Sequence, residues 1–92
     1  LMKSKEACSK IVNDLRNQSF EFSYHALERM AERGLSAIDV VALIESDSLD
    51  KPVWNSKNES WNFTGYGFTS DLFTIACVYE DDGTLIVTVF WE

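Results

Sequence analysis

Apolar and polar residues follow a helical period through the first half of the chain. Between Ser4 and Gln18 the apolar positions recur every three or four residues, at Ala7, Cys8, Ile11, Val12 and Leu15. That spacing predicts an amphipathic helix. The segment "SFEF" that follows alternates polar and aromatic residues, and we expect it to be a brief extended link.

Two more helices are marked by their ends. Ser23 is a good N-cap for a helix over residues 24–33, and Gly34 can adopt the left-handed conformation that closes a helix. Ser36 and Asp39 then have the spacing of a capping box, in which each side chain bonds the backbone of the other residue. We therefore predict a third helix that runs to about Glu45.

The period changes from helical to twofold after Pro52. The segment "VWNSKNESWNF" predicts two short strands around a turn of Ser, Lys, Asn and Glu, with Trp54, Trp61 and Phe63 on one face. We expect "GYGFTSD" to be a loop whose glycines permit a sharp bend. The strongest signal is an antiparallel hairpin that pairs residues 72–79 with residues 84–91 across an Asp-Asp-Gly turn.

Helices followed by antiparallel strands predict an α+β fold. We expect about three N-terminal helices packed on one face of a three- to four-stranded antiparallel sheet. A chain of 92 residues fits a single domain, with a helical part at about residues 4–46 and a sheet part at about residues 51–91.

Strand alternation assigns the side chains of the hairpin to two faces. One face should hold Phe73, Ile75, Cys77 and Tyr79, and the other Leu72, Thr74, Ala76 and Val78. The final stretch, residues 85–91, carries no charge, and an uncharged strand at a sheet edge can pair with another chain. We expect it either to be covered within the sheet or to make a homodimer contact.

Composition indicates a globular protein, with 46% apolar and 13% aromatic residues. No apolar run reaches the ~18 residues of a membrane-spanning helix, and the amino end lacks the pattern of a secretion signal. We therefore expect a cytoplasmic protein that does not bind membranes. Cys8 and Cys77 should be free, buried thiols, and one histidine with two distant cysteines offers no zinc spacing. No metal or cofactor is expected.

Charge is distributed unevenly along the chain, whose net value is -7. All eight Lys and Arg residues lie between Lys3 and Lys57, whereas residues 58–92 carry six acids and no base. A surface of that sign repels phosphate backbones and attracts basic proteins. A basic protein partner is therefore expected ahead of RNA. Nine of the twelve aromatic residues lie between Trp54 and Trp91, mostly among these acids, so we expect them to pack in the core or an interface rather than to stack on bases.

The predicted second helix carries a column of basic-capable residues. On a wheel with about 100 degrees per residue, His25, Arg29 and Arg33 fall on one side. Leu27, Met30 and Ala31 fall on the opposite side, so the basic column is expected to be exposed and this side buried. Glu28 and Glu32 form a second column, so each i,i+4 pair joins like charges, and a compensating group is expected outside the helix.

Two hypotheses explain that column. In the first, two guanidiniums grip a phosphate and an imidazole transfers a proton, which is the minimum equipment for metal-independent RNA cleavage at the 2′-hydroxyl. In the second, Arg29 and Arg33 pair with carboxylates of the acidic last third, and His25 is a hydrogen-bonded support near the helix start. Structural ion pairs are commoner than catalytic ones, so the second is favoured.

The stretch "FSYHALERMAERGLSAIDVVALI", residues 22–44, resembles the signature of the domain-of-unknown-function 4258 family, small bacterial domains with an S-x-H-A-x-x-R-M-x-x-R-G core. The closing "IVTVFW" is similar to the last strand of that family. The resemblance implies a helix pair on a small antiparallel sheet, similar to the fold of RNA-cleaving toxins of toxin–antitoxin systems. It makes His25, Arg29 and Arg33 the candidate catalytic or anion-binding residues. Toxins of that fold usually read RNA with a basic sheet, and this chain departs from them after Lys57.

Two functions follow from these observations. The favoured one is a protein-binding module that uses an acidic sheet face or a strand edge, as part of a toxin–antitoxin-like system. The alternative is a metal-independent endoribonuclease that uses His25, Arg29 and Arg33. The sequence leaves open whether the protein is an enzyme.

Overall fold

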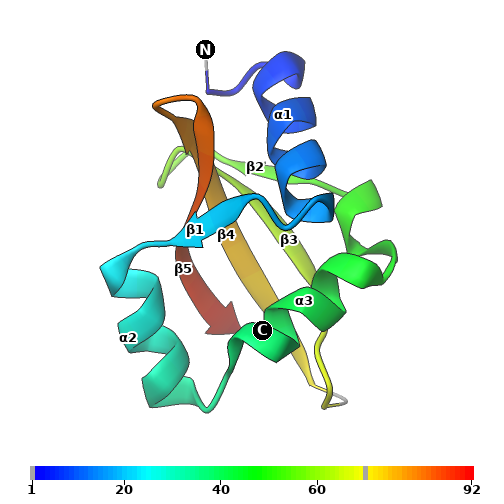
Figure 1. Cartoon of the computed structure of the whole chain (residues 1–92), viewed down its shortest axis with the longest axis vertical. Helices are drawn as coiled ribbons and strands as arrows, with labels where there is room; N and C mark the ends of the chain where they lie inside the picture. Colours follow the sequence, from blue (N-terminus) through cyan, green and yellow to red (C-terminus); the bar gives the residue numbers. More distant parts are fainter. Residues whose placement is uncertain (1, 70) are drawn as a thin grey trace.

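The computed structural model describes residues 2–69 and 71–92, which form three α-helices, one 3-10 helix and five strands. In chain order the elements are α1 (Lys5–Arg16), β1 (Phe20–Phe22), α2 (Tyr24–Arg33), α3 (Ala37–Glu45), η1 (Asp47–Asp50), β2 (Val53–Asn55), β3 (Ser60–Tyr66), β4 (Leu72–Glu80) and β5 (Gly83–Trp91). The strands form one sheet in the order β1-β5-β4-β3-β2. Figure 1 shows α1 and α3 in front of this sheet, with α2 alongside β5.

All three predicted helices are present, and serine caps begin each of them. The hydroxyl of Ser4 accepts a 3.0 Å bond from the Ala7 amide, and α2 begins with the corresponding bond to Ser23. Both halves of the predicted capping box are formed at the start of α3. Gly34 ends α2 with a φ of 69°, the left-handed conformation that a residue without Cβ adopts most readily.

The sheet differs from the predicted one in size and in direction. It has five strands, and β1 pairs in parallel with β5 while the other neighbours are antiparallel. The extra strand is the "SFEF" segment, which we expected to be only a link. Three residues are too few for a periodic signal, so whether they join a sheet depends on whether a partner edge lies beside them.

The C-terminal hairpin has the predicted pairing, from Phe73 opposite Trp91 to Glu80 opposite Gly83. Its turn residues Asp81 and Asp82 have φ values of 51° and 63°, as a type I′ turn requires at both central positions. The register shifts between Ala76 and Cys77, where β5 carries one extra residue. This bulge was not apparent in the alternation pattern.

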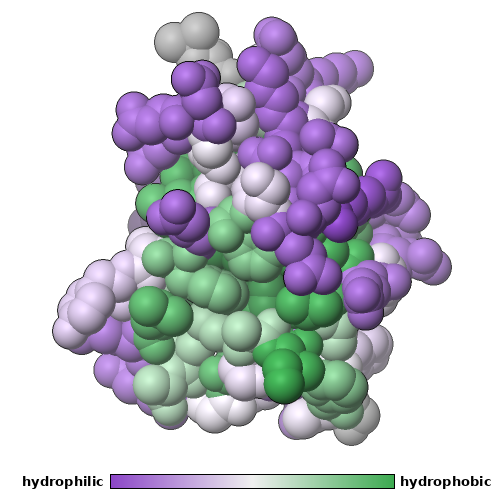
Figure 2. Space-filling view, in the orientation of Figure 1, coloured by the Kyte–Doolittle hydropathy of each residue, from purple (hydrophilic) through white to green (hydrophobic). Residues whose placement is uncertain are grey.

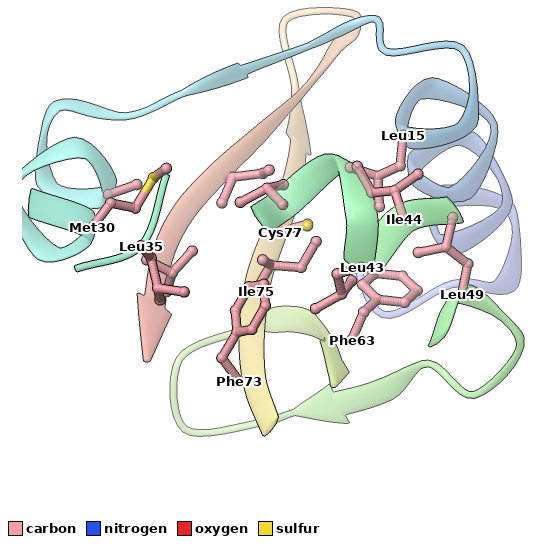
Figure 3. Packing of buried hydrophobic residues seen from close by; sticks show 14 of the residues in the cluster. Leu15, Met30, Leu35, Leu43, Ile44, Leu49, Phe63, Phe73, Ile75 and Cys77 are labelled. Atoms are coloured by element: carbon pink, nitrogen blue, oxygen red, sulfur yellow. The ribbon is translucent and has the colours of Figure 1, made fainter. Parts of the chain in front are cut away.

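One face of the sheet packs against the helices. Its fully buried side chains are Phe63, Phe73, Ile75, Cys77, Ile86 and Val89. Buried residues of all three helices join them in a single core cluster. Figure 3 shows Leu43 and Ile44 of α3 over the sheet residues, with Met30 and Leu35 at the end beside α2. The predicted shared face of the hairpin is therefore the face toward the helices.

Two glycines of the predicted "GYGFTSD" loop have a different role from the one expected. Gly65 lies inside β3, and neither Gly65 nor Gly67 has a positive φ. A Cβ on Gly65 would lie 1.8 Å from the hydroxyl oxygen of Ser48, and one on Gly67 would lie 2.8 Å from a carboxylate oxygen of Asp39. The two glycines therefore do not bend the chain. Their lack of a side chain allows η1 and α3 to pack closely against the sheet.

Asp39 joins the start of α3 to the segment after β3. One carboxylate oxygen accepts a 3.0 Å bond from the Phe68 amide, and the other accepts bonds from the amide and hydroxyl of Ser36. The Phe68 and Ser36 backbone bonds lower the pKa of Asp39, because they favour the charged form.

Within the described residues, no helix is long and apolar enough to cross a bilayer.

The contact at Gly65 predicts a specific destabilisation. Gly65→Ala should lower the free energy of unfolding by about 1–3 kcal/mol, because the new methyl group overpacks the site. Ser48→Gly in the same chain should restore part of the loss, since it removes both Ser48 atoms that lie within 3 Å of that methyl position. Gly83→Ala is the control, because the nearest atom there is 4.0 Å away. Urea unfolding measures all four proteins, and equal losses at positions 65 and 83 would contradict the packing argument.

Asp39 predicts a pH dependence of stability. Its pKa in the folded state lies below the unfolded value of about 3.9, so its contribution should be fully present above that value and disappear as the pH falls through the folded pKa. Asp39→Asn should therefore be less stable than the wild type by about 1–2 kcal/mol at pH 7, with the difference shrinking below pH 4. Asp82→Asn, in the exposed turn, is the control. Urea unfolding from pH 2.5 to 7 tests this, and a difference independent of pH would refute it.

Candidate functional site

Helix α2 lies along the outer edge of β5, and this placement decides which of its residues are buried. Ala26 and Met30 face the core, whereas Leu27 is 50% exposed and Ala31 is exposed. The prediction that Leu27 and Ala31 lie on the buried side was therefore wrong. A helix at a sheet edge buries only a narrow stripe, so the wheel could not locate that stripe from hydrophobicity alone.

The three predicted site residues are not equally exposed. His25 is exposed, while Arg29 and Arg33 are partly buried beside the stripe of Ala26 and Met30. They share one helix, but the structure gives them different partners. They consequently do not form the uniform exposed column that the wheel predicted.

Arg33 is bound to the sheet. Its guanidinium donates to the backbone carbonyl of Val89 in β5. In return, the indole nitrogen of Trp91 donates a 3.1 Å bond to the carbonyl of Arg33. The last turn of α2 is thus tied to the last residues of β5 from both sides.

Ser23, just before the start of α2, is also bonded to β5. Its amide donates a 2.9 Å bond to the carbonyl of Ile86, and its hydroxyl donates a 3.0 Å bond to the carbonyl of Val87. β1 pairs with β5 only as far as Ile86. Ser23 and Arg33 thus donate to three carbonyls of β5 at and beyond the end of β1, those of Ile86, Val87 and Val89, and we call this set of bonds the β5 edge cap. These bonds occupy carbonyl groups that another strand would need for pairing at this edge.

Arg29 is neutralised within its own helix. Its guanidinium lies 2.8 Å from the carboxylate of Glu32, one turn away. We predicted that both arginines pair with carboxylates of the last third of the chain, and that a compensating group lies outside the helix. The first statement is wrong for both arginines, because neither pairs with a carboxylate of the last third. The second is wrong for Arg29, whose partner Glu32 lies on the same helix, but holds for Arg33, whose partner is the Val89 carbonyl of β5.

The best-formed cavity among the described residues is not at the motif. A cavity of about 570 Å³ lies at the other end of β5, between residues 18–21 and 80–85. None of His25, Arg29 and Arg33 lines it. The side chain of His25 is exposed, so a reaction at this residue would lack the enclosure that strengthens electrostatic catalysis.

Both cysteines are buried and free, as predicted. Burial raises the pKa of Cys8 and of Cys77, and the proximity of Cys8 raises that of Cys77 further. A thiol with a raised pKa is a poor nucleophile. In the described part of the chain, no group of three His, Cys, Asp or Glu side chains is placed to hold a metal ion.

The second side of the sheet carries no helix from the described residues. All three helices share one core cluster with one sheet face, so the alternate strand residues point the other way. We call this second side the open face. Its residues on the three long strands are Asn62, Thr64, Tyr66, Leu72, Thr74, Ala76, Val78, Glu80, Leu85, Thr88 and Phe90. Sequence alternation predicted the β4 members Leu72, Thr74, Ala76 and Val78 of this set, but not that none of the described helices covers them.

The charge of the open face has one sign. Strands β3, β4 and β5 contain no Lys or Arg. Glu92 lies on this side, because its carboxylate accepts a bond from the Thr74 hydroxyl, and Glu21 of β1 points the same way, since Phe20 and Phe22 pack against the core. Figure 2 shows the helix side, with hydrophilic surface around α1 and hydrophobic surface over α3 and the strip between α2 and α3.

Comparison with known proteins gives one match. A family model described as a domain of unknown function, DUF4258, matches residues 22–91. No curated protein and no solved structure matches the chain. The matched range runs from the last residue of β1 to the last residue of β5, so it contains both ends of the β5 edge cap.

The β5 edge cap predicts unequal roles for the two arginines. Arg33→Met keeps most of the side-chain length but removes the donor to Val89, and it should lower the free energy of unfolding by about 1–2 kcal/mol. Arg29→Met removes only an exposed pair and should cost about 0–1 kcal/mol. Chemical unfolding of the two variants measures the difference. Equal losses, or a larger loss at Arg29, would contradict a capping role for Arg33.

Proposed function

The chain belongs to the DUF4258 family, and for this member we propose a protein-binding module whose open face engages a basic protein. The observation that carries the proposal is a sheet face that is partly apolar, carries only acidic charges on its three long strands, and is covered by none of the described helices. Exposed apolar surface with a polar rim is typical of interaction sites. By the family resemblance, we assign it to a two-protein system of the toxin–antitoxin kind.

The sign of the charge supports a basic protein over a nucleic acid. Binding to RNA gains most of its free energy from cations that neutralise phosphates. The long strands carry none, and the acids Glu21, Glu80 and Glu92 would repel the backbone. A protein surface with Lys and Arg would instead gain steering and specificity from the same acids.

The ribonuclease alternative has less support. The guanidinium of Arg33 donates to a carbonyl of β5 and that of Arg29 pairs with Glu32, so each already uses part of its donor set within the protein. His25 lies on the same helix, but no described group is hydrogen-bonded to it to set its tautomer. We therefore propose that the motif serves the fold and that binding takes place at the sheet.

Capture of the partner from the cells that encode the protein tests the proposal. The tagged chain is compared with a variant that carries Glu21→Gln, Glu80→Gln and Glu92→Gln, and with a control variant that carries Glu6→Gln, Glu28→Gln and Glu45→Gln on the helices. We expect a partner with a basic surface whose Kd rises at least tenfold with the first variant and less than twofold with the second. Added salt should weaken wild-type binding. A partner that binds all three proteins equally would refute the proposal.

A cleavage assay separates the two functions. With EDTA present, the wild-type protein should leave a mixed single-stranded RNA intact, at the level of His25→Ala. That variant should keep the thermal midpoint of the wild type, because the side chain of His25 is exposed. RNA cleavage that the wild type performs and His25→Ala loses by a hundredfold or more would establish the alternative instead.

A further inference from the structure

The register of the strands arranges the open face in rows. One row joins Leu85 of β5 to Val78 of β4, and Glu21 of β1 extends it on the other side of Leu85. A row near the opposite end joins Leu72 to Tyr66. Glu92 lies beside that end, because its amide donates to the carbonyl of Leu72. Each end of the face thus combines large apolar side chains with a carboxylate.

Small side chains occupy the middle of the face. Thr74 pairs with Thr64 on one side and with Phe90 on the other, and the two threonine hydroxyls lie 2.6 Å apart. Ala76, the next residue in this direction, is only 1% exposed. The centre is therefore low and internally hydrogen-bonded, while the apolar atoms that still meet water belong to the larger residues around it, including Leu72 at 40% exposure.

The two edges of the sheet offer a partner strand much less surface than the open face offers. On one side, the β5 edge cap occupies the carbonyls beyond β1, and β1 has only three residues. On the other side, β2 also has three residues and follows Pro52, which has no amide hydrogen to donate. A partner that gains its affinity from main-chain pairing would find only short ladders there, so the face is the larger surface.

We propose that the open face binds a cationic amphipathic helix of the partner, an inference that rests on the proposed function and specifies its ligand. Strands β4 and β5 have nine residues each, which at ~3.3 Å per residue is a length of about 30 Å. A helix of about 20 residues has the same length. Its apolar stripe covers Leu72, Val78 and Leu85, and its Lys or Arg residues reach Glu21, Glu80 and Glu92.

The exposed apolar residues of the helix side do not make an equivalent site. Ile38 on α3 is 60% exposed and Leu27 on α2 is 50% exposed. The charges on α2 have both signs, with Glu28 and Glu32 beside Arg29. No single sign is present there to select a partner, whereas the open face favours one sign throughout. A second copy of this chain is also a poor occupant of the open face, because the net charge of each copy is -7.

Selection from two displayed peptide libraries tests this inference on the full chain. Both libraries consist of 20-residue peptides whose polar positions are randomised among Lys, Arg, Asp, Glu, Ser and Gln. The first places Leu at helical spacing, and the second places Leu at alternate positions as in a strand. Selected peptides are synthesised, and their Kd is measured against the wild type, Leu72→Lys on the open face and Ile38→Lys on the helix side. These two variants make the same change in charge at two exposed aliphatic residues.

We expect selected peptides to come from the helical library, to be enriched in Lys and Arg, and to bind Leu72→Lys at least tenfold more weakly than the wild type. Ile38→Lys should change the Kd by less than twofold. Glu21→Gln with Glu80→Gln is a second variant that should weaken binding and that leaves the apolar surface intact, should Leu72→Lys alter the strand. Selection of strand-patterned or acidic peptides, binding that is insensitive to both open-face variants, or no selected peptide at all would overturn the inference.

Failure of this inference is distinguishable from failure of the proposed function. If the native partner loses affinity for the variant with three Glu→Gln changes on the open face but no helical peptide does, the module binds there through another kind of structure. If the native partner is unaffected by those changes, the proposed function itself is wrong.

Discussion

Strand β5 continues past the end of β1, so carbonyl groups on that edge of β5 need donors from another part of the chain. The arrangement of the N-terminal half depends on how this need is met. A buried or half-buried carbonyl without a donor is costly, and an open edge invites pairing with other chains. The amide and hydroxyl of Ser23 and the guanidinium of Arg33 supply the donors. α2 is placed where it is because both of its ends are held to β5 by these bonds.

The β5 edge cap gives a physical role to most of the motif that the family resemblance rests on. Ser23 is both the N-cap of α2 and a donor to the sheet, Ala26 and Met30 fill the narrow stripe against the core, and Gly34 turns the chain toward α3. Arg33 closes the far end. A motif that looks like an arrangement of catalytic groups along a helix is, in this structure, largely a device for attaching a helix to a strand edge. Neither His25 nor Arg29 has a bond to β5 among those of the described residues, since Arg29 pairs with Glu32 of its own helix.

The same arrangement leaves the molecule with two different sides. Every helix packs against one face of the sheet, so the helices bring their bases to that side and to the edges. The last three strands contribute acids and no bases to the other side, because residues 58–92 contain no Lys or Arg. The asymmetry of charge along the sequence thus becomes an asymmetry between two faces. This asymmetry is the physical basis of our proposal that binding takes place at the sheet rather than at the motif.

Much of the fold could be predicted from the sequence because it depends on local rules. The capped ends of α2 and α3, the twofold period after Pro52 and the Asp-Asp turn of the hairpin all follow from interactions between residues close together in the chain, and all are present. Three features required the tertiary structure: the parallel strand β1, the inward face of α2 and the partners of Arg29 and Arg33. The three-residue strand β1 forms only because the edge of β5 lies beside it. An arginine side chain is long enough to reach acids and carbonyls in several directions, so its actual partner is decided only by the packing of the folded chain. The sequence thus determined which side chains the protein has and which helices and strands carry them. Contacts between residues more than 50 positions apart decided that the motif attaches α2 to β5. The packing of all three helices on one face decided that none of them covers the other side of the sheet.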